Sequence, residues 1–272
     1  MTLDGEFNGV ERSLMLLKPD GARSAAVRKD LLDGLASKGL QIQAERIVHL
    51  SEDEIVQLWP MFRSPAHAIM REFYFRYMRE GVCVAFLVSG ARAVEDCCEV
   101  KHSLRAKYEA CAFENALHCP SDAYERDINL ETLFSIQVPQ SALNSPPEDN
   151  RVGFHGKAAG AGPSDFRAMV ARIWADKERG GWPATFVAKA AGRYDVVVLP
   201  GDPNPIDYGI CVLHDHLDLP LETAMRLYIE SEVRRGAAVR SGEHDEIADL
   251  AAMLKDKGLR VVVRERAALS ES

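Results

Sequence analysis

Glu11–Gly21 reads ERSLMLLKPDG and predicts the first strand of a sheet together with the loop that follows it. The apolar run from Ser13 to Leu17 has the length and composition of a short buried strand. Lys18-Pro19-Asp20-Gly21 predicts a turn, because Pro and Gly interrupt regular structure. A lysine placed directly after a strand can hold phosphate oxygens as a compact positive charge.

The segments that follow alternate between helical and strand patterns. Apolar residues at helical spacing predict a helix that ends at Gly39, and a capping box opens another helix. The resulting β-α-β-α-β order predicts an α/β or α+β sheet covered by helices. The predicted segments are a helix around Val27–Leu35, a strand at Leu40–Leu50, a helix opened by Ser51–Glu54, a helix at Ala66–Arg79 and a buried strand at Val82–Val88.

Length and composition limit the classes of protein to consider. The 272 residues, 47% of them hydrophobic and 27% charged, favour two globular domains. A net charge of −8 argues against a dedicated nucleic-acid-binding protein, because phosphate backbones attract basic surfaces. Six cysteines without a CxxC pair favour a reduced, cytoplasmic protein. The first residues lack a secretory signal pattern and no apolar run has membrane-spanning length, so we expect no membrane contact.

The composition changes after Phe134 and predicts a division into domains. We expect a first domain at residues 1–138, a linker at 139–192 and a second domain at 193–272. The linker is rich in Pro, Gly, Ala and Ser but contains one amphipathic helix, marked by Phe166, Val170 and Trp174. The second domain is expected to contain a strand at Tyr194–Leu199, a hard turn at Pro200–Pro205, two helices that end at Gly236, a strand at Ala237–Val239, a helix at Glu243–Lys257 and a strand at Leu259–Arg264.

Four residues of the first domain suit the handling of phosphate. The neutral imidazole of His118 is a competent phosphate acceptor near neutral pH. Lys18 offers a point charge, and Arg105 a planar fork of donors that matches phosphate oxygens. The side chain of Asn115 can hydrogen-bond a sugar hydroxyl or a bridging oxygen. Phosphoryl transfer needs little more than such positioning and charge.

The same residues carry a resemblance to a known family. Glu11–Gly21 is similar to the opening strand and Lys-Pro-Asp-Gly turn of nucleoside diphosphate kinases. Ser103–Tyr108 (SLRAKY) resembles the arginine segment of divergent members. Asn115–His118 (NALH) resembles the motif that carries the phosphorylated histidine. The resemblance covers about Glu11–Phe134 and implies a ferredoxin-like fold, an α/β (α+β) sheet with helices.

The resemblance implies roles for these residues. His118 would take the terminal phosphate of ATP or another nucleoside triphosphate and pass it to a small-molecule acceptor. Lys18, Arg105 and Asn115 would contact phosphates and sugar, and Trp59 falls near a tyrosine that contacts phosphate in the family. Mg²⁺ would arrive with the nucleotide, so no metal site built by the protein is expected. The family also implies a homo-oligomer.

The chain departs from the family at two places. Gly90–Arg105 is shorter by about one short helix, which removes a second phosphate-binding arginine; Lys101 or His102 are the candidates to compensate. The glutamate that orients the histidine falls at Asn129, with Asp127 and Glu131 as close alternatives. Loss of that carboxylate would weaken control of the imidazole tautomer.

The second domain resembles a different family. Tyr194–Leu213 (YDVVVLPGDPNPIDYGICVL) is similar to the start of the Clp protease adaptor ClpS, and the resemblance extends over about Arg193–Glu265. It implies a small α/β fold. Pro200 and Gly201 replace the residues that would bind a substrate α-amino group, and Val233 replaces a pocket histidine. These changes predict a docking or dimerisation module. The histidines of the HDH run that follows do not share a helix face, so a polar helix end is favoured over a metal site.

Two functions therefore compete. The first is an enzyme, a nucleoside diphosphate kinase-like phosphotransferase or nucleotide-dependent enzyme, including one repurposed for a specialised substrate. The alternative is a non-catalytic nucleotide-sensing or adaptor protein that docks a protein partner through its degenerate ClpS-like domain. A thiol nucleophile at Cys119 with His118 as its base is disfavoured, because adjacent residues rarely face one another. A structural scaffold would leave the residues around His118 unexplained.

Overall fold

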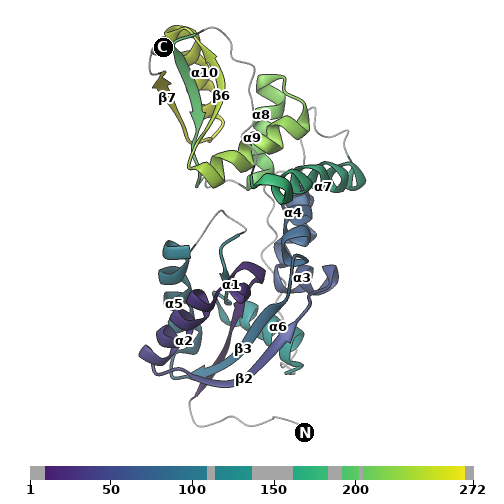
Figure 1. The fold of residues 1–272 in the computed structure, drawn as a ribbon, viewed down its shortest axis with the longest axis vertical. Coiled ribbons are helices and arrows are strands. Elements are labelled where there is room, and N and C mark those ends of the chain that lie inside the picture. Colours follow the sequence, from purple (N-terminus) through teal and green to yellow (C-terminus); the bar gives the residue numbers. More distant parts are fainter. Residues whose placement is uncertain (1–9, 109–113, 137–161, 183–191, 202–204, 267–272) are drawn as a thin grey trace. The chain divides into compact units, whose positions relative to one another are not determined.

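The computed structural model describes residues 10–108, 114–136, 162–182, 192–201 and 205–266 (Figure 1). The chain divides into two compact units. The first comprises residues 1–63 and 73–149, and the second comprises residues 64–72 and 150–272. Most of the linker predicted at 139–192 lies outside the described residues, but its amphipathic helix is present as α7 (Pro163–Gly180).

The first unit is built on a four-stranded antiparallel sheet. Its order is β2-β3-β1-β4, so the first strand lies in the interior of the sheet between the third and the fourth. This order, with helices between the strands, is the ferredoxin-like arrangement and confirms the predicted fold class. The strands are β1 (Glu11–Leu17), β2 (Gln41–Val48), β3 (Cys83–Gly90) and β4 (Leu117–His118).

Helices cover both faces of this sheet (Figure 1). Helices α2 and α5 pack together with Met15, Leu17 and Phe86 in one hydrophobic core, while α3 and α6 contact each other on the other face. The helices are α1 (Pro19–Arg23), α2 (Ala25–Ser37), α3 (Glu52–Leu58), α4 (Ala68–Met78), α5 (Ala93–Tyr108) and α6 (Ala123–Phe134). The 3₁₀ turns η1 (Pro60–Arg63) and η2 (Pro65–His67) precede α4.

The turn predicted at Lys18–Gly21 is wrong in one respect. Lys18 is the N-cap of the short helix α1, and Pro19 occupies its first turn. Proline is well suited to that position, because its fixed φ is helical and its missing N–H would have no partner there. The capping box predicted at Ser51 is confirmed, since Ser51 and Glu54 exchange both of its hydrogen bonds.

The second unit contains a three-stranded antiparallel sheet of order β6-β5-β7. The predicted elements are present, and the final helix spans thirteen residues. Whether the unit is ClpS-like stays a prediction, and part of the turn predicted at Pro200–Pro205 lies outside the described residues. Its elements besides α7 are β5 (Tyr194–Val198), α8 (Ile206–Leu217), α9 (Leu221–Arg234), β6 (Ala237–Gly242), α10 (His244–Asp256) and β7 (Val261–Glu265).

A buried carboxylate caps the start of α4, whose residues up to Glu72 belong, like the carboxylate, to the second unit. Asp207, 2% exposed, accepts hydrogen bonds from the backbone N–H groups of Ile69 and Met70 at 2.6 and 2.9 Å. These N–H groups lie in the first turn of the helix, where no intrahelical acceptor exists. Burial nevertheless raises the pKa of Asp207 to about 7, because it disfavours the charged form.

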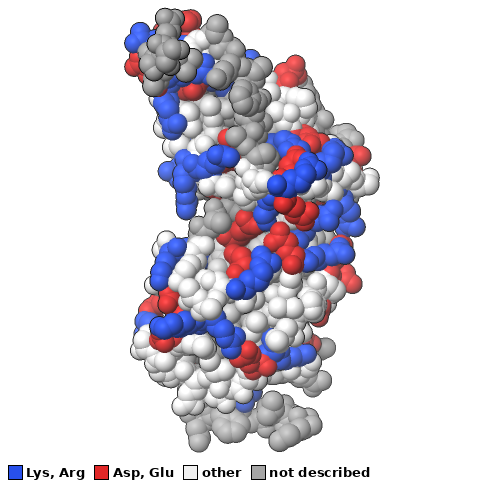
Figure 2. All heavy atoms as spheres, viewed as in Figure 1, with Lys and Arg blue, Asp and Glu red and all other residues white. Residues whose placement is uncertain are grey.

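The described surface carries both signs of charge. Figure 2 shows Lys and Arg side chains interspersed with Asp and Glu over the face in view. Among the described residues, no helix is long and apolar enough to cross a membrane. Strand β2 is an edge of its sheet and is mostly exposed, including Ile42 at 42% and Ile47 at 69%.

Candidate active site

The loop that leads into β4 is held against the start of α1. The backbone N–H of Lys18 donates to the carbonyl of Ala116 at 2.9 Å, and Asp20 accepts from the N–H of Ala116 at 3.1 Å. Ala116 has a φ of 59°, in the left-handed region that residues other than glycine adopt uncommonly. A Cβ at Gly21 would lie 2.4 Å from the Ala116 carbonyl oxygen, so only glycine permits this approach. The Lys-Pro-Asp-Gly sequence thus fixes the loop before His118.

Lys18 is buried at this junction and is 1% exposed. Its Nζ donates to Oδ1 of Asn115 at 2.5 Å. The ammonium also lies 4.9 Å from the ring centroid of Tyr74 and 5.8 Å from the centroids of Trp59 and Tyr77. Ring faces attract a cation and so offset part of the cost of burying it.

The imidazole of His118 contacts the side-chain amide of Asn129 and the indole of Trp59. Its Nε2 is 2.7 Å from Oδ1 of Asn129, and its ring centroid is 4.6 Å from that of Trp59 at an interplanar angle of 58°. The imidazole is 4% exposed. An amide oxygen only accepts hydrogen bonds, so in this arrangement Nε2 carries the proton and Nδ1 keeps its lone pair.

Burial keeps this imidazole neutral. It lowers the pKa of His118 from 6.5 to about 3, because the charged form loses its hydration. The hydrogen bond to Asn129 opposes the shift, whereas the cations of Lys18, Lys101 and Arg105 add to it. At neutral pH His118 is therefore a neutral base in a positively charged setting.

Two of these cations have no carboxylate partner in the described part of the chain. Arg105 donates from Nε and Nη2 to the carbonyl of Leu117, at 3.1 and 2.6 Å. Lys101, 7% exposed, donates to the carbonyl of Cys119 at 3.3 Å. Within the described ranges, neither forms an ion pair with Asp or Glu. A positively charged site that retains such cations favours an anionic ligand.

The structure brings the five predicted site residues into one region. Lys18 hydrogen-bonds Asn115, the indole of Trp59 contacts the imidazole of His118 in a tilted arrangement, and Arg105 binds the carbonyl next to His118. These contacts are geometric, and the functional roles remain predictions.

The structure distinguishes between the candidates for the missing arginine and between those for the missing glutamate. Lys101 points inward, whereas His102 is exposed. Among the three candidates for the orienting position, Asn129 contacts His118. Asp127 instead pairs with Arg126 at 2.7 Å, and Glu131 is exposed.

Two neighbours of the site were not predicted. Asp20 holds the loop before His118 and also accepts a hydrogen bond from the hydroxyl of Tyr77. Glu125 Oε1 lies 3.7 Å from His118 Nε2. The only sequence signal for Asp20 was its place in the quoted Lys-Pro-Asp-Gly stretch. Glu125 resembles an ordinary acidic residue in the first turn of a helix.

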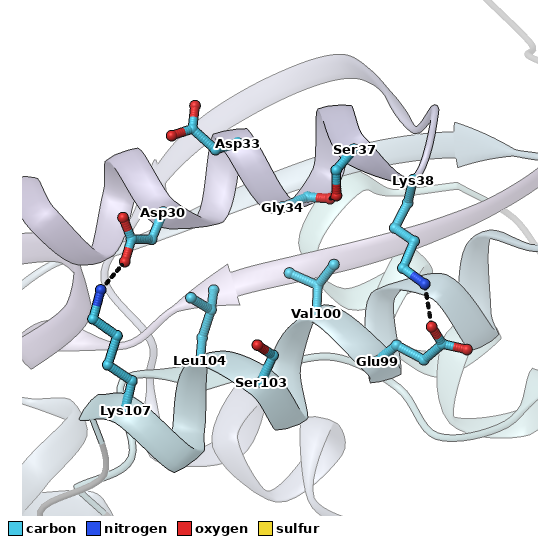
Figure 3. Close-up of a pocket in the computed structure, with 10 residues that line it drawn as sticks. All are labelled: Asp30, Asp33, Gly34, Ser37, Lys38, Glu99, Val100, Ser103, Leu104 and Lys107. Atoms are coloured by element: carbon cyan, nitrogen blue, oxygen red, sulfur yellow. Dashed lines mark hydrogen bonds and ion pairs between the residues drawn. The ribbon is translucent and has the colours of Figure 1, made fainter.

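A separate groove runs between α2 and α5 (Figure 3). Its volume is about 540 Å³, and ion pairs of Lys38 with Glu99 and of Lys107 with Asp30 cross it near its two ends. Its lining contains none of the five predicted site residues. No group of three or more His, Cys, Asp or Glu side chains in the described part of the chain could hold a metal ion.

Comparison with known proteins gives structural matches only. No protein-family model matches the sequence, and no curated protein matches it. The solved structures similar to this chain include nucleoside diphosphate kinases from Aquifex aeolicus, Encephalitozoon cuniculi and Pyrobaculum aerophilum.

These matches share a low sequence identity. The Aquifex enzyme is 23% identical over 47% of this chain and 99% of its own, with a TM-score of 0.39. The Encephalitozoon enzyme is 16% identical over 47% of this chain and 93% of its own, with a TM-score of 0.40. The Pyrobaculum enzyme is 17% identical over 47% of this chain and 100% of its own, with a TM-score of 0.37. Since all three scores lie below 0.5, only the chain's own residues can decide what the site does.

Proposed function

We propose that the first unit binds a nucleoside triphosphate and transfers its terminal phosphate through His118. The observation that carries the proposal is that Lys101 and Arg105 bind the backbone carbonyls on either side of His118, those of Cys119 and Leu117. Burial keeps the imidazole between them neutral by lowering its pKa. A neutral imidazole is a nucleophile, and nearby cations stabilise the charge that develops on transferring phosphate oxygens.

In the proposed first step, Nδ1 of His118 attacks the terminal phosphorus. An N–P bond forms, the P–O bond to the leaving diphosphate breaks, and the diphosphate keeps the electron pair. With Oδ1 of Asn129 facing Nε2, the proton lies on Nε2 and the lone pair on Nδ1; the other amide orientation would reverse this. In the second step, an oxygen of a small-molecule acceptor attacks the phosphorus and the N–P bond breaks.

We assign binding roles to the neighbouring residues. Arg105 and Lys18 would contact phosphate oxygens, Asn115 a sugar hydroxyl or phosphate oxygen, and Trp59 the nucleotide. Mg²⁺ would arrive with ATP or another triphosphate and would not need a cage of protein ligands. That ion would neutralise phosphate charge.

A labelling experiment tests the proposal. The full chain is incubated with Mg²⁺ and ATP labelled on the terminal phosphate, and acid-labile label on the protein is measured. We expect the natural protein to be labelled and His118→Ala to lose the label. The matched control His102→Ala replaces an exposed histidine of α5 and should label normally. Label that survives in His118→Ala would overturn the assignment.

The second candidate function is non-catalytic nucleotide sensing. Trp59 covers His118, which is only 4% exposed, and an amide stands where a carboxylate would fix the tautomer. A sensor would bind nucleotide without transferring phosphate. Calorimetry distinguishes the two, because a sensor shows nucleotide binding and no label, whereas the enzyme shows both.

We also propose that the protein forms a homo-oligomer. The support is the exposed edge of β2, where Ile42 and Ile47 lie in solvent although β-branched apolar residues usually pack. Analytical ultracentrifugation of Ile47→Lys tests this, with Val262→Lys in the second unit as the control. A natural protein that sediments as a monomer contradicts it.

For the second unit we propose docking to a protein partner. The support is the ClpS resemblance of Tyr194–Leu213 together with the loss of residues that would bind an α-amino group. We place the protein in the cytoplasm, because the described cysteines are all free thiols. A pull-down with residues 193–272 deleted should lose a partner that the full chain retains.

A further inference from the structure

Two cysteines from different elements meet next to His118. Cys98 lies on α5, and Cys119 follows β4 directly after His118. Their sulfur atoms are 3.7 Å apart, with the Cys119 thiol donating to Cys98. A disulfide has an S–S distance of about 2.04 Å. The two sulfur atoms, now 3.7 Å apart, must therefore move closer by about 1.7 Å before they can bond.

The Cys98 sulfur lies close to a cation and to a backbone acceptor, since the thiol donates a hydrogen bond to the carbonyl oxygen of Pro120 at 3.2 Å. Nζ of Lys101 lies 4.0 Å from the Cys98 sulfur and has no carboxylate partner among the described residues. A buried ammonium requires a compensating charge or acceptors, and a thiolate at Cys98 supplies the charge. Arg105 adds to this effect, while Glu125 opposes it.

The two thiols differ in pKa and in exposure, as a reactive thiol and its buried partner would. The hydrogen bond from Cys119 and the nearby cations lower the pKa of Cys98 to about 6, and its side chain is partly exposed. Cys119 is 1% exposed, and its pKa is raised. Burial raises the pKa values of Cys83, Cys97 and Cys211 to about 12. Among the described cysteines, only Cys98 is both partly exposed and lowered in pKa.

We propose that Cys98 and Cys119 form a peroxide-reactive pair that closes to a disulfide beside His118. In the first step the Cys98 thiolate attacks one oxygen of a hydroperoxide. An S–O bond forms, the O–O bond breaks, and the leaving oxygen takes a proton to give an alcohol or water. Cys119 then attacks the sulfur of the sulfenic acid, and its proton leaves with the hydroxyl as water. Two thiols and one peroxide thus give one disulfide, with the peroxide reduced.

Closure of this disulfide would also act on the phosphate site. It pulls the backbone after His118 toward α5, and it removes the thiolate that balances Lys101. This consequence rests on the proposed phosphotransfer function, whereas formation of the disulfide does not. Oxidation should therefore abolish labelling of His118, and a dithiol reductant should restore it.

Peptide mapping of the natural full chain tests the pair. The reduced protein is treated with hydrogen peroxide at neutral pH, free thiols are blocked with an alkylating agent, and linked peptides are identified by mass spectrometry. We expect a Cys98–Cys119 linkage that dithiothreitol reverses. In Cys119→Ser, a sulfenic acid should accumulate on Cys98 and be trapped by dimedone. The control Cys211→Ser replaces another partly exposed thiol and should leave the linkage unchanged.

Rates give a second readout that does not require a variant. Alkylation and oxidation of Cys98 should be at least about tenfold faster than those of Cys211, because the thiolate is the reactive species. The proposal is overturned if peroxide leaves both thiols free, if Cys98 proceeds to a sulfinic acid while Cys119 stays reduced, or if Cys98 links to another cysteine such as Cys111. If the linkage forms but reduced protein never takes up label, the phosphotransfer function fails and the thiol pair stands.

Discussion

Oδ1 of Asn129 lies 2.7 Å from Nε2 of His118, whereas Nδ2 of the same amide is buried without a hydrogen-bond partner among the described residues. A carboxylate at this position could only accept, and would hold the proton on Nε2. An amide can turn over and donate instead, which would place the proton on Nδ1. The contact therefore positions the ring but controls its tautomer only weakly.

Replacing this amide by a carboxylate should strengthen control of the histidine. In Asn129→Glu the negative charge favours the imidazolium, so the pKa of His118 should rise and its proton should stay on Nε2. We expect faster labelling by ATP, and NMR titration of the imidazole measures the pKa directly. Asn129→Leu is the control and should leave labelling slower than in the natural protein. Equal rates in all three proteins would contradict an orienting role.

The low pKa of His118 predicts acid sensitivity of the first unit. Because the folded pKa of about 3 lies below the ordinary value of 6.5, the unfolded chain binds an additional proton between these values. The free energy of unfolding should therefore fall as the pH drops from about 6.5 toward about 3. Urea unfolding of His118→Gln should show a weaker dependence over this range. A variant with the same slope as the natural protein would show that burial does not lower this pKa.

Much of the first unit could be predicted from the sequence because its signals are local. The apolar run of β3 and the Ser51 capping box each depend on neighbours in the chain. Lys18 and His118 could be named as candidate site residues because each lies in a short sequence motif. The turn at Lys18–Gly21 was misassigned because Pro and Gly occur both in turns and at helix ends, and local composition does not separate the two.

The remaining features depend on contacts between distant residues. Asp20 is hydrogen-bonded to Ala116, 96 positions away in the sequence, and Asp207 is hydrogen-bonded to Ile69, 138 positions away. The pairing of Cys98 with Cys119 likewise requires α5 to lie against β4. Residue spacing in a single sequence does not predict such contacts, because they depend on how the sheet and the helices pack.

The close approach at Gly21 predicts a specific loss of stability. A methyl group there would lie 2.4 Å from the Ala116 carbonyl oxygen, so Gly21→Ala must displace the loop before His118. Overpacking of this kind costs about 1–3 kcal/mol, and both the unfolding midpoint and His118 labelling should fall. Gly180→Ala is the matched control, since a Cβ there meets no atom within 4 Å and alanine favours a helix.

If Gly21→Ala unfolded at the same denaturant concentration as the natural protein, the loop would be free to move. The Lys-Pro-Asp-Gly sequence would then not fix it.

Arg105 should contribute to nucleotide affinity more than to folding. Its guanidinium is anchored on the Leu117 carbonyl, and a charge-assisted hydrogen bond contributes roughly 1.5–3 kcal/mol. Arg105→Met should therefore weaken nucleotide binding about tenfold to a hundredfold in calorimetry. His102→Ala changes an exposed residue of the same helix and should bind normally. Unchanged affinity in Arg105→Met would remove this residue from the binding site.

Asp207 predicts the opposite pH dependence in the second unit. Its folded pKa of about 7 lies above the ordinary 3.8, so the folded form binds the additional proton between these values. The unit should be most stable in mild acid and lose stability as the pH rises toward about 7, by on the order of a few kcal/mol. Asp207→Asn should flatten this dependence in thermal unfolding. A natural protein whose stability does not change over this range would contradict the raised pKa.

The central claim is that His118 accepts the terminal phosphate of a nucleoside triphosphate. Tandem mass spectrometry under alkaline conditions, after incubation of the reduced full chain with ATP and Mg²⁺, tests it most directly. We predict a phosphoryl group on the peptide that contains His118, located on the imidazole and removed when a nucleoside diphosphate is added. A phosphoryl group on another residue, or none while calorimetry shows bound nucleotide, would contradict the claim.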